Sequence, residues 1–401
     1  MDDIVFLSRI IPEHMNEVKL NRKNTMTESG EALMWKIIRG LDANLNHPIT
    51  LMNYLPVQSY PKNYNKPFIK RSIFSHALGA VDINLPFNNV QYIKRLFMGR
   101  SLQKEIKKWA SKKTNHRKIL ISYSMYPETM RAMKVAKRID SKITTCVIVA
   151  DLPQYTILTN KISFSSRIYL SWLKKNTFNK LLYIDKFVLL TEFMSEKLVS
   201  NQEYIVMEGI STNFNQNVVG DKREKNIVYA GTLNEKFGIK HLVDAFSKVQ
   251  SEEYKLVICG MGDSEDYIKM QSNKDSRIVF LGQLERMKAL EVISTASIIV
   301  NPRFEKEEYT KYSFPSKNLE ALSSGIPFIA YKLAGIPEEY DSYIVYPKNE
   351  STDALTDTIQ EVINNYDYYC DRAKKAEEWV SKEKNEKKQG KRILDLIYEK
   401  K

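Results

Sequence analysis

The chain has 401 residues, of which 43% are hydrophobic and 27% charged, and its formal net charge is +13. This length exceeds what one small core needs and predicts two domains of ordinary size. No apolar run approaches the roughly 18–20 residues of a membrane-spanning helix, and the first residues, MDDIVFLSRI, do not resemble a secretory leader. Cys146, Cys259 and Cys370 lie too far apart for a metal site, which predicts reduced core cysteines in a cytosolic protein.

The first half of the chain alternates between predicted strands and helices. Short apolar runs predict strands at residues 4–7, 49–52, 119–122, 145–149, 187–191 and 205–209. Apolar periodicity predicts helices at residues 32–41, 93–109 and 129–139, whereas residues 56–90 follow no clear pattern. Such alternation indicates a parallel α/β sheet, which binds ligands beyond the carboxyl ends of its strands. Tyr123, Tyr126 and Asp151 lie at such strand ends and are therefore candidate site residues.

The positive charge concentrates in three runs, at residues 104–118, 161–186 and 382–401. One such run is often only a solvated helix face, but three runs and a large net charge favour an anionic partner surface. The run at 161–186 also carries apolar and aromatic residues, which predicts a basic amphipathic helix. Two interpretations stay open for it: a surface helix packed on the core, or a helix that lies on an anionic membrane surface.

Residues 211–225 are polar and lack periodicity, which predicts a linker between two domains. The second half then resumes with strands predicted at residues 227–230, 256–259, 278–282, 298–300 and 328–331, separated by helices that include 239–249 and 290–296. This pattern predicts a second doubly wound α/β domain. We therefore expect an N-terminal domain over 1–212, a C-terminal domain over 213–380, and a final helix over 381–401 that packs back on the N-terminal domain.

Arg303 follows the buried strand predicted at 298–300 and stands in a polar loop. Its planar guanidinium suits a phosphate ligand, although a surface ion pair with Glu305 or Glu308 is an equal alternative. We take Arg303 as a candidate cation of an anion-binding site.

A helix start follows that loop. Ser313 is a predicted cap and Pro315 suits the first helical turn, so the free N–H groups of residues 313–317 predict a phosphate cradle. Glu320 lies inside the same predicted helix among apolar neighbours. Its carboxylate could accept hydrogen bonds from two sugar hydroxyls, or it could simply be an exposed helix carboxylate.

Two glycine turns add further candidates. Gly231 has no side chain that would block a phosphate, and Gly260 and Gly262 form a second tight turn. A single G-x-G is a weak signal, because ordinary strand-to-helix turns often have the same spelling.

Four ordered blocks, at residues 229–246, 256–263, 277–302 and 313–330, resemble the nucleotide-binding domain of retaining GT-B glycosyltransferases of the "glycosyl transferases group 1" family. The first half is similar to that family only in architecture and in short fragments. The resemblance implies a GT-B fold, in which two Rossmann-like doubly wound domains face each other across a cleft. It also implies acceptor binding by the N-terminal domain and donor binding by the C-terminal domain.

The resemblance implies that Glu320 binds the ribose hydroxyls of a nucleotide-sugar donor. The family's paired acid would stand at Tyr312, its phosphate-binding arginine at Thr232, and its lysine one residue from Lys236. We expect Arg303 to supply the missing guanidinium. The matched blocks imply this donor-binding set: Gly231, Thr232, Gly260, Gly262, Leu284, Ser313, Phe314, Pro315, Ser316, Lys317 and Glu320.

The resemblance further implies transfer of a sugar from a nucleotide donor, expected to be UDP-linked, to a saccharide with retention and without a metal or other cofactor. Arg303 and Lys236 would stabilise the leaving diphosphate, and Asp151 would orient the acceptor or the donor sugar. The acceptor is expected on a polyprenyl lipid in bacterial capsule, exopolysaccharide or O-antigen synthesis. The enzyme would then lie in the cytoplasm, peripheral to the inner face of the plasma membrane.

Three other functions stay open. The departures at Tyr312 and Thr232 also fit a catalytically degenerate GT-B protein that acts as a binding partner. A sugar-nucleotide epimerase would need acid and base groups that the sequence does not reveal. Nucleic-acid binding ranks last, because the sequence shows no RNA-binding motif that combines aromatic and basic residues.

Overall fold

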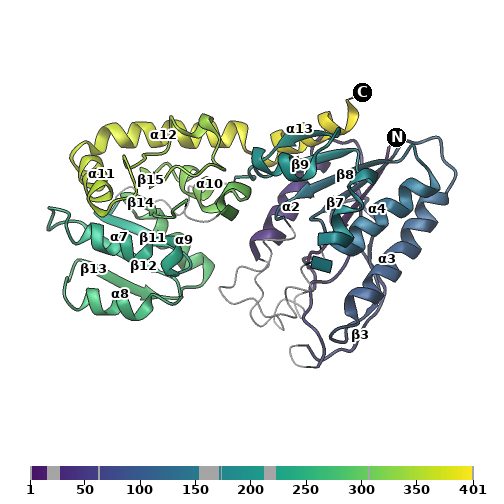
Figure 1. Ribbon diagram of the computed structural model, residues 1–401, viewed down its shortest axis with the longest axis horizontal. Helices are drawn as coiled ribbons and strands as arrows, with labels where there is room; N and C mark the ends of the chain where they lie inside the picture. The colour runs from purple at the N-terminus through teal and green to yellow at the C-terminus, as the bar shows by residue number, and fades with distance from the viewer. Residues whose placement is uncertain are drawn as a thin grey trace. The chain divides into compact units, whose positions relative to one another are not determined.

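The computed structural model describes residues 2–15, 28–61, 64–152, 171–172, 174–211, 223–305 and 308–399. The chain forms two compact units (Figure 1). The first unit comprises Met1–Ile210 together with Glu386–Lys401, and the second comprises Ser211–Asn385. The chain thus returns to the first unit at Glu386, a few residues after the expected boundary at 381.

The first unit is built on an eight-stranded sheet with the order β10-β9-β8-β7-β1-β2-β5-β4. Its strands are β1 (Asp3–Ser8), β2 (Thr50–Asn53), β4 (Ser72–Phe74), β5 (Asp82–Asn84), β7 (Lys118–Tyr123), β8 (Thr144–Val149), β9 (Lys186–Leu189) and β10 (Glu203–Val206). All neighbours pair in parallel except β4 and β5. The central strands β1, β7 and β8 are buried almost throughout, which is why they are continuous apolar runs in the sequence.

The helices of the first unit are α2 (Glu28–Asp42), α3 (Lys94–Ser111), α4 (Pro127–Ile139), the short α6 (Ser195–Leu198) and α13 (Glu386–Tyr398). Helix α13 packs closely on α2, since a Cβ atom at Gly40 would lie 2.2 Å from the Glu386 carbonyl oxygen. An ion pair of 2.6 Å joins Arg39 to the Glu386 carboxylate at the same crossing. Of the basic helix predicted at 161–186, residues 161–170 and 173 lie outside the described residues. The described part is helical at 171–172 and 174–178 and then forms the 3-10 helix η2 (Leu181–Tyr183) before β9.

Residues 56–90, which no sequence pattern assigned, contain short strands. The hairpin of β4 and β5 forms one edge of the large sheet, and β3 (Phe68–Ile69) pairs with β6 (Phe87–Asn88) in a separate antiparallel ribbon. The His76 imidazole joins the hairpin to α2, because its nitrogens lie 2.7 Å from an Asp82 carboxylate oxygen and 2.9 Å from one of Asp42. These strands have two or three residues each, which is too short to show a reliable period.

The second unit contains a parallel five-stranded sheet with the order β13-β12-β11-β14-β15. Its strands are β11 (Asn226–Ala230), β12 (Lys255–Cys259), β13 (Ile278–Gly282), β14 (Ile298–Asn301) and β15 (Phe328–Ala330). Its helices are α7 (Ile239–Phe246), α8 (Glu265–Ser272), α9 (Arg286–Ser294), α10 (Ser316–Leu322), α11 (Thr352–Asn364) and α12 (Tyr366–Glu383). The predicted α/β class and both parallel sheets are confirmed.

Side chains of this sheet alternate between two buried layers. Ile227 and Tyr229 pack in one layer, which includes side chains of α7 and α11, whereas Val228 packs in the other, with side chains of α10 and α12. Because both faces are covered, polar groups collect at the ends of the strands rather than along them. Within the described ranges, no helix combines the length and apolar character needed to span a membrane.

Candidate functional site

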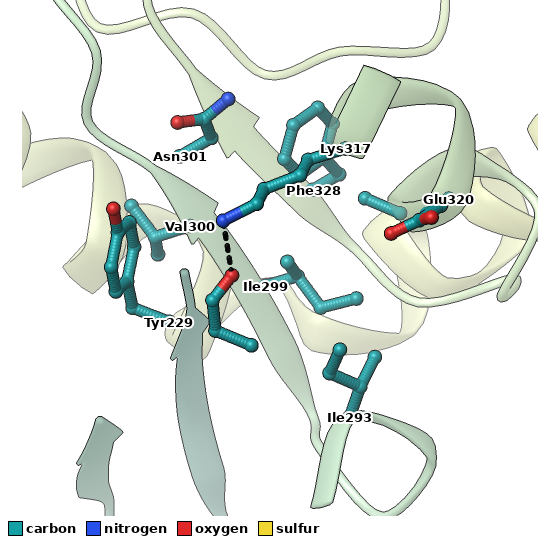
Figure 2. A pocket seen from close by; sticks show the side chains of 10 residues that line it. Tyr229, Ile293, Ile299, Val300, Asn301, Lys317, Glu320 and Phe328 are labelled. Atoms are coloured by element: carbon teal, nitrogen blue, oxygen red, sulfur yellow. Dashed lines mark hydrogen bonds between the residues drawn. The ribbon is translucent and has the colours of Figure 1, made fainter. Parts of the chain in front are cut away.

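A pocket in the second unit is lined by the carboxyl-terminal parts of β11 and β14, the first residue of β15, and residues of α9 and α10 (Figure 2). Apolar side chains of Ile299 and Phe328 form part of its wall. Its charged and polar lining residues are Lys317, Glu320, Asn301 and Tyr229. The pocket therefore joins an apolar wall to groups of both charges, which suits a ligand with a flat base and charged or hydroxylated parts.

Lys317 reaches from α10 across the sheet, as Figure 2 shows, and its Nζ donates to the Ala230 carbonyl oxygen at 2.7 Å. A Cβ atom at Gly231 would lie 1.7 Å from this Nζ, so glycine there makes room for the lysine. This corrects the expectation that Gly231 leaves its space open to a phosphate. Lys317 is exposed as a residue, yet partial desolvation of its ammonium group lowers its pKa, while the Glu320 charge acts in the opposite direction.

Arg303 lies on the loop that follows β14. Its Nη2 donates to the Ser313 hydroxyl at 3.2 Å, and its guanidinium carbon lies 5.5 Å from the Phe237 ring centre and 5.1 Å from that of Tyr309. No carboxylate among the described residues pairs with it, so neither predicted ion pair, with Glu305 or with Glu308, is formed. Its buried Nε also lacks a partner there. The Arg303 guanidinium therefore keeps hydrogen-bonding capacity for an anionic ligand.

The loop that carries Arg303 is held by close packing. Gly238 adopts a left-handed φ of 80°, and a Cβ atom there would lie 2.0 Å from the Pro302 carbonyl oxygen. Phe304, the residue after Arg303, stacks on Tyr331 with the ring centres 5.3 Å apart. Its ring also meets that of His241 edge-on, with the centres 4.9 Å apart. These contacts fix the direction in which the loop leaves β14.

Lys236 is the middle residue of the short 3-10 helix η5 (Glu235–Phe237), and this helix ends immediately before Gly238. Its Nζ lies 5.4 Å from the centre of the Phe237 ring, which also contacts Arg303. Arg303 in turn lowers the pKa of Lys317, although burial is the larger cause. Lys236 and Arg303 thus both lie beside the Phe237 ring, and Arg303 is close enough to Lys317 to affect its pKa.

Glu320 projects from α10 at the rim of the pocket (Figure 2). Its side chain is 37% exposed, and its Oε1 lies 3.9 Å from a guanidinium nitrogen of Arg286. This pair is long and exposed, so it ties up little of the carboxylate. Of the two interpretations of Glu320, the structure supports a carboxylate that borders a pocket and retains free acceptor capacity.

The start of α10 differs from the prediction. The helix begins at Ser316, Pro315 is its N-cap residue, and no side chain caps it. Ser313 is not a cap, because it lies before the helix and accepts a hydrogen bond from Arg303. Phe314 packs in the core against Tyr340 at 5.3 Å, so its side chain anchors the turn.

The glycines at the ends of β11 and β12 serve backbone packing. A Cβ atom at Gly260 would lie 1.7 Å from the Gly231 carbonyl oxygen, and one at Gly262 would lie 2.5 Å from the Leu233 carbonyl. The N–H groups of Gly231 and Gly260 donate to other backbone carbonyls, and that of Gly262 donates to Glu265. These three N–H groups are therefore unavailable to a phosphate.

Three further residues complete the comparison with the predicted set. Thr232 is exposed, and its carbonyl oxygen accepts a hydrogen bond of 2.8 Å from the Tyr229 hydroxyl. Leu284 lies between β13 and α9 and is not a lining residue of the pocket. Tyr312 is 6% exposed, so the position expected for a paired acid belongs to the core.

One group was missed from the sequence. The side-chain Nδ2 of Asn301, the last residue of β14, donates to Asn318 Oδ1 at 2.9 Å, and the side-chain Nδ2 of Asn318 is buried without a partner among the described residues. The position of Asn301 at the end of a predicted strand was the available signal.

Asp151 lies in the first unit, beyond the carboxyl end of β8. Asp151 is exposed as a residue, yet partial desolvation of its carboxyl group raises the carboxyl pKa. Burial, and then the Asp151 charge, raise the pKa of the Tyr123 hydroxyl. Arg9, which follows β1, stacks on Tyr126 at 3.7 Å and forms an ion pair with buried Glu128. The carboxyl ends of β1, β7 and β8 thus gather a polar cluster of their own.

Comparison with known proteins identifies glycosyltransferase relatives. Residues 224–365, which contain the pocket, match the model of the family described as glycosyl transferases group 1. An uncharacterized glycosyltransferase of Methanocaldococcus jannaschii is 28% identical over 174 residues, which are 41% of this chain and 43% of that relative. The chain thus aligns with less than half of this relative's length.

Solved structures extend the similarity to both units. Sucrose-phosphate synthase from Thermosynechococcus elongatus has a TM-score of 0.63 at 16% identity, over 98% of each chain. A glycosyltransferase from Rickettsia africae has a TM-score of 0.61 at 13% identity, over 99% of this chain and 98% of its own. TarM has a TM-score of 0.62 at 10% identity, over 100% of this chain and 99% of its own. At such identities the likeness shows the fold: the chain has a GT-B fold with two Rossmann-like domains.

Proposed function

We propose that the protein is a glycosyltransferase that moves a sugar from a nucleotide donor, UDP-linked in our proposal, to a saccharide acceptor. The observation that carries the proposal is the group of three cations, Lys236, Arg303 and Lys317, at one strand end beside Glu320. It lies in the part of the chain that matches the glycosyltransferase family model. Structural neighbours add chemical support, since S. aureus TarM was solved with UDP and starch synthase IV of Arabidopsis thaliana with ADP and acarbose.

In this proposal the pocket holds the donor. The base lies against the apolar wall formed by Ile299 and Phe328, and Glu320 accepts hydrogen bonds from the ribose hydroxyls. The diphosphate faces Lys317 and Arg303, which have no carboxylate as direct hydrogen-bond partner among the described residues. An anion there would restore a more ordinary pKa to Lys317, because it offsets the cost of burying a positive charge.

The proposed reaction breaks the bond between the anomeric carbon and the diphosphate oxygen. The acceptor hydroxyl bonds to that carbon on the same face, and its proton passes to the departing phosphate oxygen. Lys317, Arg303 and Lys236 stabilise the negative charge that develops on this oxygen, an effect worth about 3–4 kcal/mol for one well-placed donor. The proposal includes no metal, because these cations meet the charge of the leaving group.

The proposal assigns the acceptor to the first unit, where Asp151 and Tyr126 offer a carboxylate and a hydroxyl at strand ends. A saccharide carried on a polyprenyl lipid in bacterial surface-polysaccharide synthesis is the acceptor class we propose. The enzyme would then work at the cytoplasmic face of the plasma membrane.

The first test is a series of nucleotides and nucleotide sugars, each measured for thermal stabilisation of the full chain. The proposal predicts stabilisation by UDP and UDP-sugars above GDP or dTDP counterparts, and loss of that stabilisation in Arg303→Ala. The preferred donor is then incubated with lipid-linked saccharides, and the anomeric configuration of the product is read by NMR. Absence of nucleotide binding contradicts the proposal, whereas binding without transfer favours a degenerate binding protein.

A further inference from the structure

A surface of the first unit combines exposed apolar and basic side chains, and we refer to it as the basic-apolar face. It comprises the apolar residues Phe68, Val90, Tyr92, Ile93 and Leu96 and the basic residues Arg95, Arg100, Lys104, Lys107 and Lys108. Its most exposed aromatic side chain is Tyr92, at 94%, and Phe68 and Leu96 are 47% and 46% exposed. Large apolar side chains with so much solvent contact, grouped in one region, mark an interaction site.

The register of the β3–β6 ribbon explains why this face is apolar. Ile69 pairs with Phe87, and both side chains are buried. Phe68 pairs with Asn88, so Phe68 and Val90 project from the opposite side of the ribbon. The chain then runs directly into α3, since the Lys94 N–H donates to the Val90 carbonyl oxygen at 3.0 Å. The ribbon and the start of α3 therefore form a continuous surface.

Helix α3, which is labelled in Figure 1, carries the basic residues of this face in its sequence. It buries the side formed by Met98, Gly99, Leu102, Ile106 and Ala110, and exposes Arg95, Leu96, Arg100, Lys104, Lys107 and Lys108. Its sequence holds six basic residues and a single acid, Glu105, which pairs with Arg71 at 2.6 Å. Arg100, Lys104, Lys107 and Lys108 thus share the exposed side of α3, where Leu96 also lies.

The first turn of α3 is unfavourable for the isolated protein. Lys94 and Arg95 occupy it, and it contains no acid. A helix N-terminus carries a partial positive charge, so cations there cost free energy. The pKa of Lys94 is lowered to about 8, first by burial and then by the charges of Arg9 and Arg95. The Lys94 ammonium donates to the Val57 carbonyl oxygen inside the unit, so the cations open to an external anion are the exposed ones further along α3.

We propose that the basic-apolar face docks on an anionic lipid bilayer. Lysine and arginine side chains on one stripe suit lipid headgroups, while aromatic and aliphatic side chains beside them suit the headgroup–acyl boundary. A nucleic acid would use the cations but would leave Ile93 and Leu96 exposed to water. The inference rests on the proposed function, because membrane docking would bring the enzyme to a lipid-linked acceptor. Docking itself does not require a bound donor.

The charge component is tested with the full chain and vesicles of phosphatidylcholine with or without phosphatidylglycerol. We expect binding only to the anionic vesicles. The triple variant Arg100→Glu, Lys104→Glu, Lys107→Glu should lower the affinity about a hundredfold or more, since each basic residue near an anionic surface contributes about 1 kcal/mol, or about fivefold in affinity. The matched control reverses exposed Lys374, Lys375 and Lys382 on α12, changes the net charge equally, and should change affinity less than threefold.

The apolar component is tested at high salt, where headgroup attraction is screened. Tyr92→Ser with Leu96→Ser should abolish the binding that remains in salt, whereas Tyr368→Ser with Met287→Ser, at exposed apolar positions of the second unit, should leave it unchanged. An equal loss of vesicle binding in both double variants would overturn the proposal. Binding of the wild type to neutral vesicles but not to anionic ones would overturn it as well.

Two competitors identify other partners. Tighter binding to a DNA duplex than to anionic vesicles at the same salt concentration would replace the proposal with a nucleic-acid surface. Full displacement from vesicles by millimolar inorganic phosphate would replace it with a site for free phosphate. All variants are also measured for stabilisation by UDP, so a failed donor site and a failed docking surface give separate results.

Discussion

Both units collect polar side chains beyond the carboxyl ends of parallel strands, but they balance charge differently. In the first unit the Arg9 guanidinium pairs with buried Glu128, so its charge is neutralised internally. In the second unit Lys317 donates to a backbone carbonyl and Arg303 to a hydroxyl. The same strand-end geometry thus prepares the second unit for an external anion, whereas the first unit suits uncharged groups such as sugar hydroxyls.

The largest expected effect comes from removing a cation of the second unit. Arg303→Ala should lower the turnover number about 10²–10³-fold, because it removes a donor to the charge that develops on the diphosphate. Lys317→Ala should act in the same direction. Lys240→Ala is the control, since Lys240 is nearby but pairs with Glu235 at 2.8 Å. If Arg303→Ala kept a turnover number within a factor of two of wild type, the proposed role of the second unit's cations would be contradicted.

In the first unit the corresponding change should affect stability instead. Glu128→Ala leaves the Arg9 charge without its partner and should lower the free energy of unfolding by about 3 kcal/mol. The exposed pair of Glu105 with Arg71 provides the control, and Glu105→Ala should cost less than about 1 kcal/mol. Urea unfolding measures both variants. Neither should change the affinity for UDP, and a loss of UDP binding in Glu128→Ala would contradict the separation of roles.

The first unit should also respond to pH through His76. Its ring is 1% exposed, and hydrogen bonds to Asp42 and Asp82 raise its pKa to about 9 although burial opposes them. Protonated His76 therefore stabilises the fold fully below its unfolded pKa of about 6.5, and this contribution, about 2–3 kcal/mol, is lost as pH rises through 9. His76→Gln should be clearly less stable than wild type at pH 6 and nearly equal at pH 10. A constant difference in urea unfolding at both values would refute this.

The smallest expected effect concerns Glu320. Replacing it with glutamine should weaken UDP binding about tenfold, because a charged hydrogen bond to the ribose contributes about 1.5 kcal/mol. The sharper measurement compares UDP with its 2′-deoxy analogue by calorimetry. Wild type should prefer UDP, and Glu320→Gln should lose most of that preference, while Glu291→Gln on the exposed side of α9 retains it. An unchanged preference would remove Glu320 from the ribose site.

Much of the second unit follows from the sequence. Its strands are apolar runs buried on both faces, and residues that follow such runs must lie at one edge of the sheet, which was enough to find Arg303. The sequence also pointed to Gly260, but not to its role in backbone packing. It does not reveal that the Cα of Gly260 faces the Gly231 carbonyl. That contact depends on how the ends of two strands pack in space.

Other features depend on longer-range packing and escaped prediction. Lys317 fills the space beside Gly231 because α10 crosses β14, a relation between residues far apart in the chain. The His76 cluster joins a two-to-three-residue strand pair to α2, and such short strands show no periodicity. Local signals also misplaced the start of α10, because Ser313 is engaged by Arg303 instead of capping the helix.

A crystal structure of the protein with UDP tests the central claim most directly. The account predicts the diphosphate within hydrogen-bonding distance of Lys317 Nζ and the Arg303 guanidinium, and the ribose hydroxyls on the Glu320 carboxylate. A diphosphate bound away from Lys317 and Arg303, or a nucleotide bound to the first unit, would contradict it.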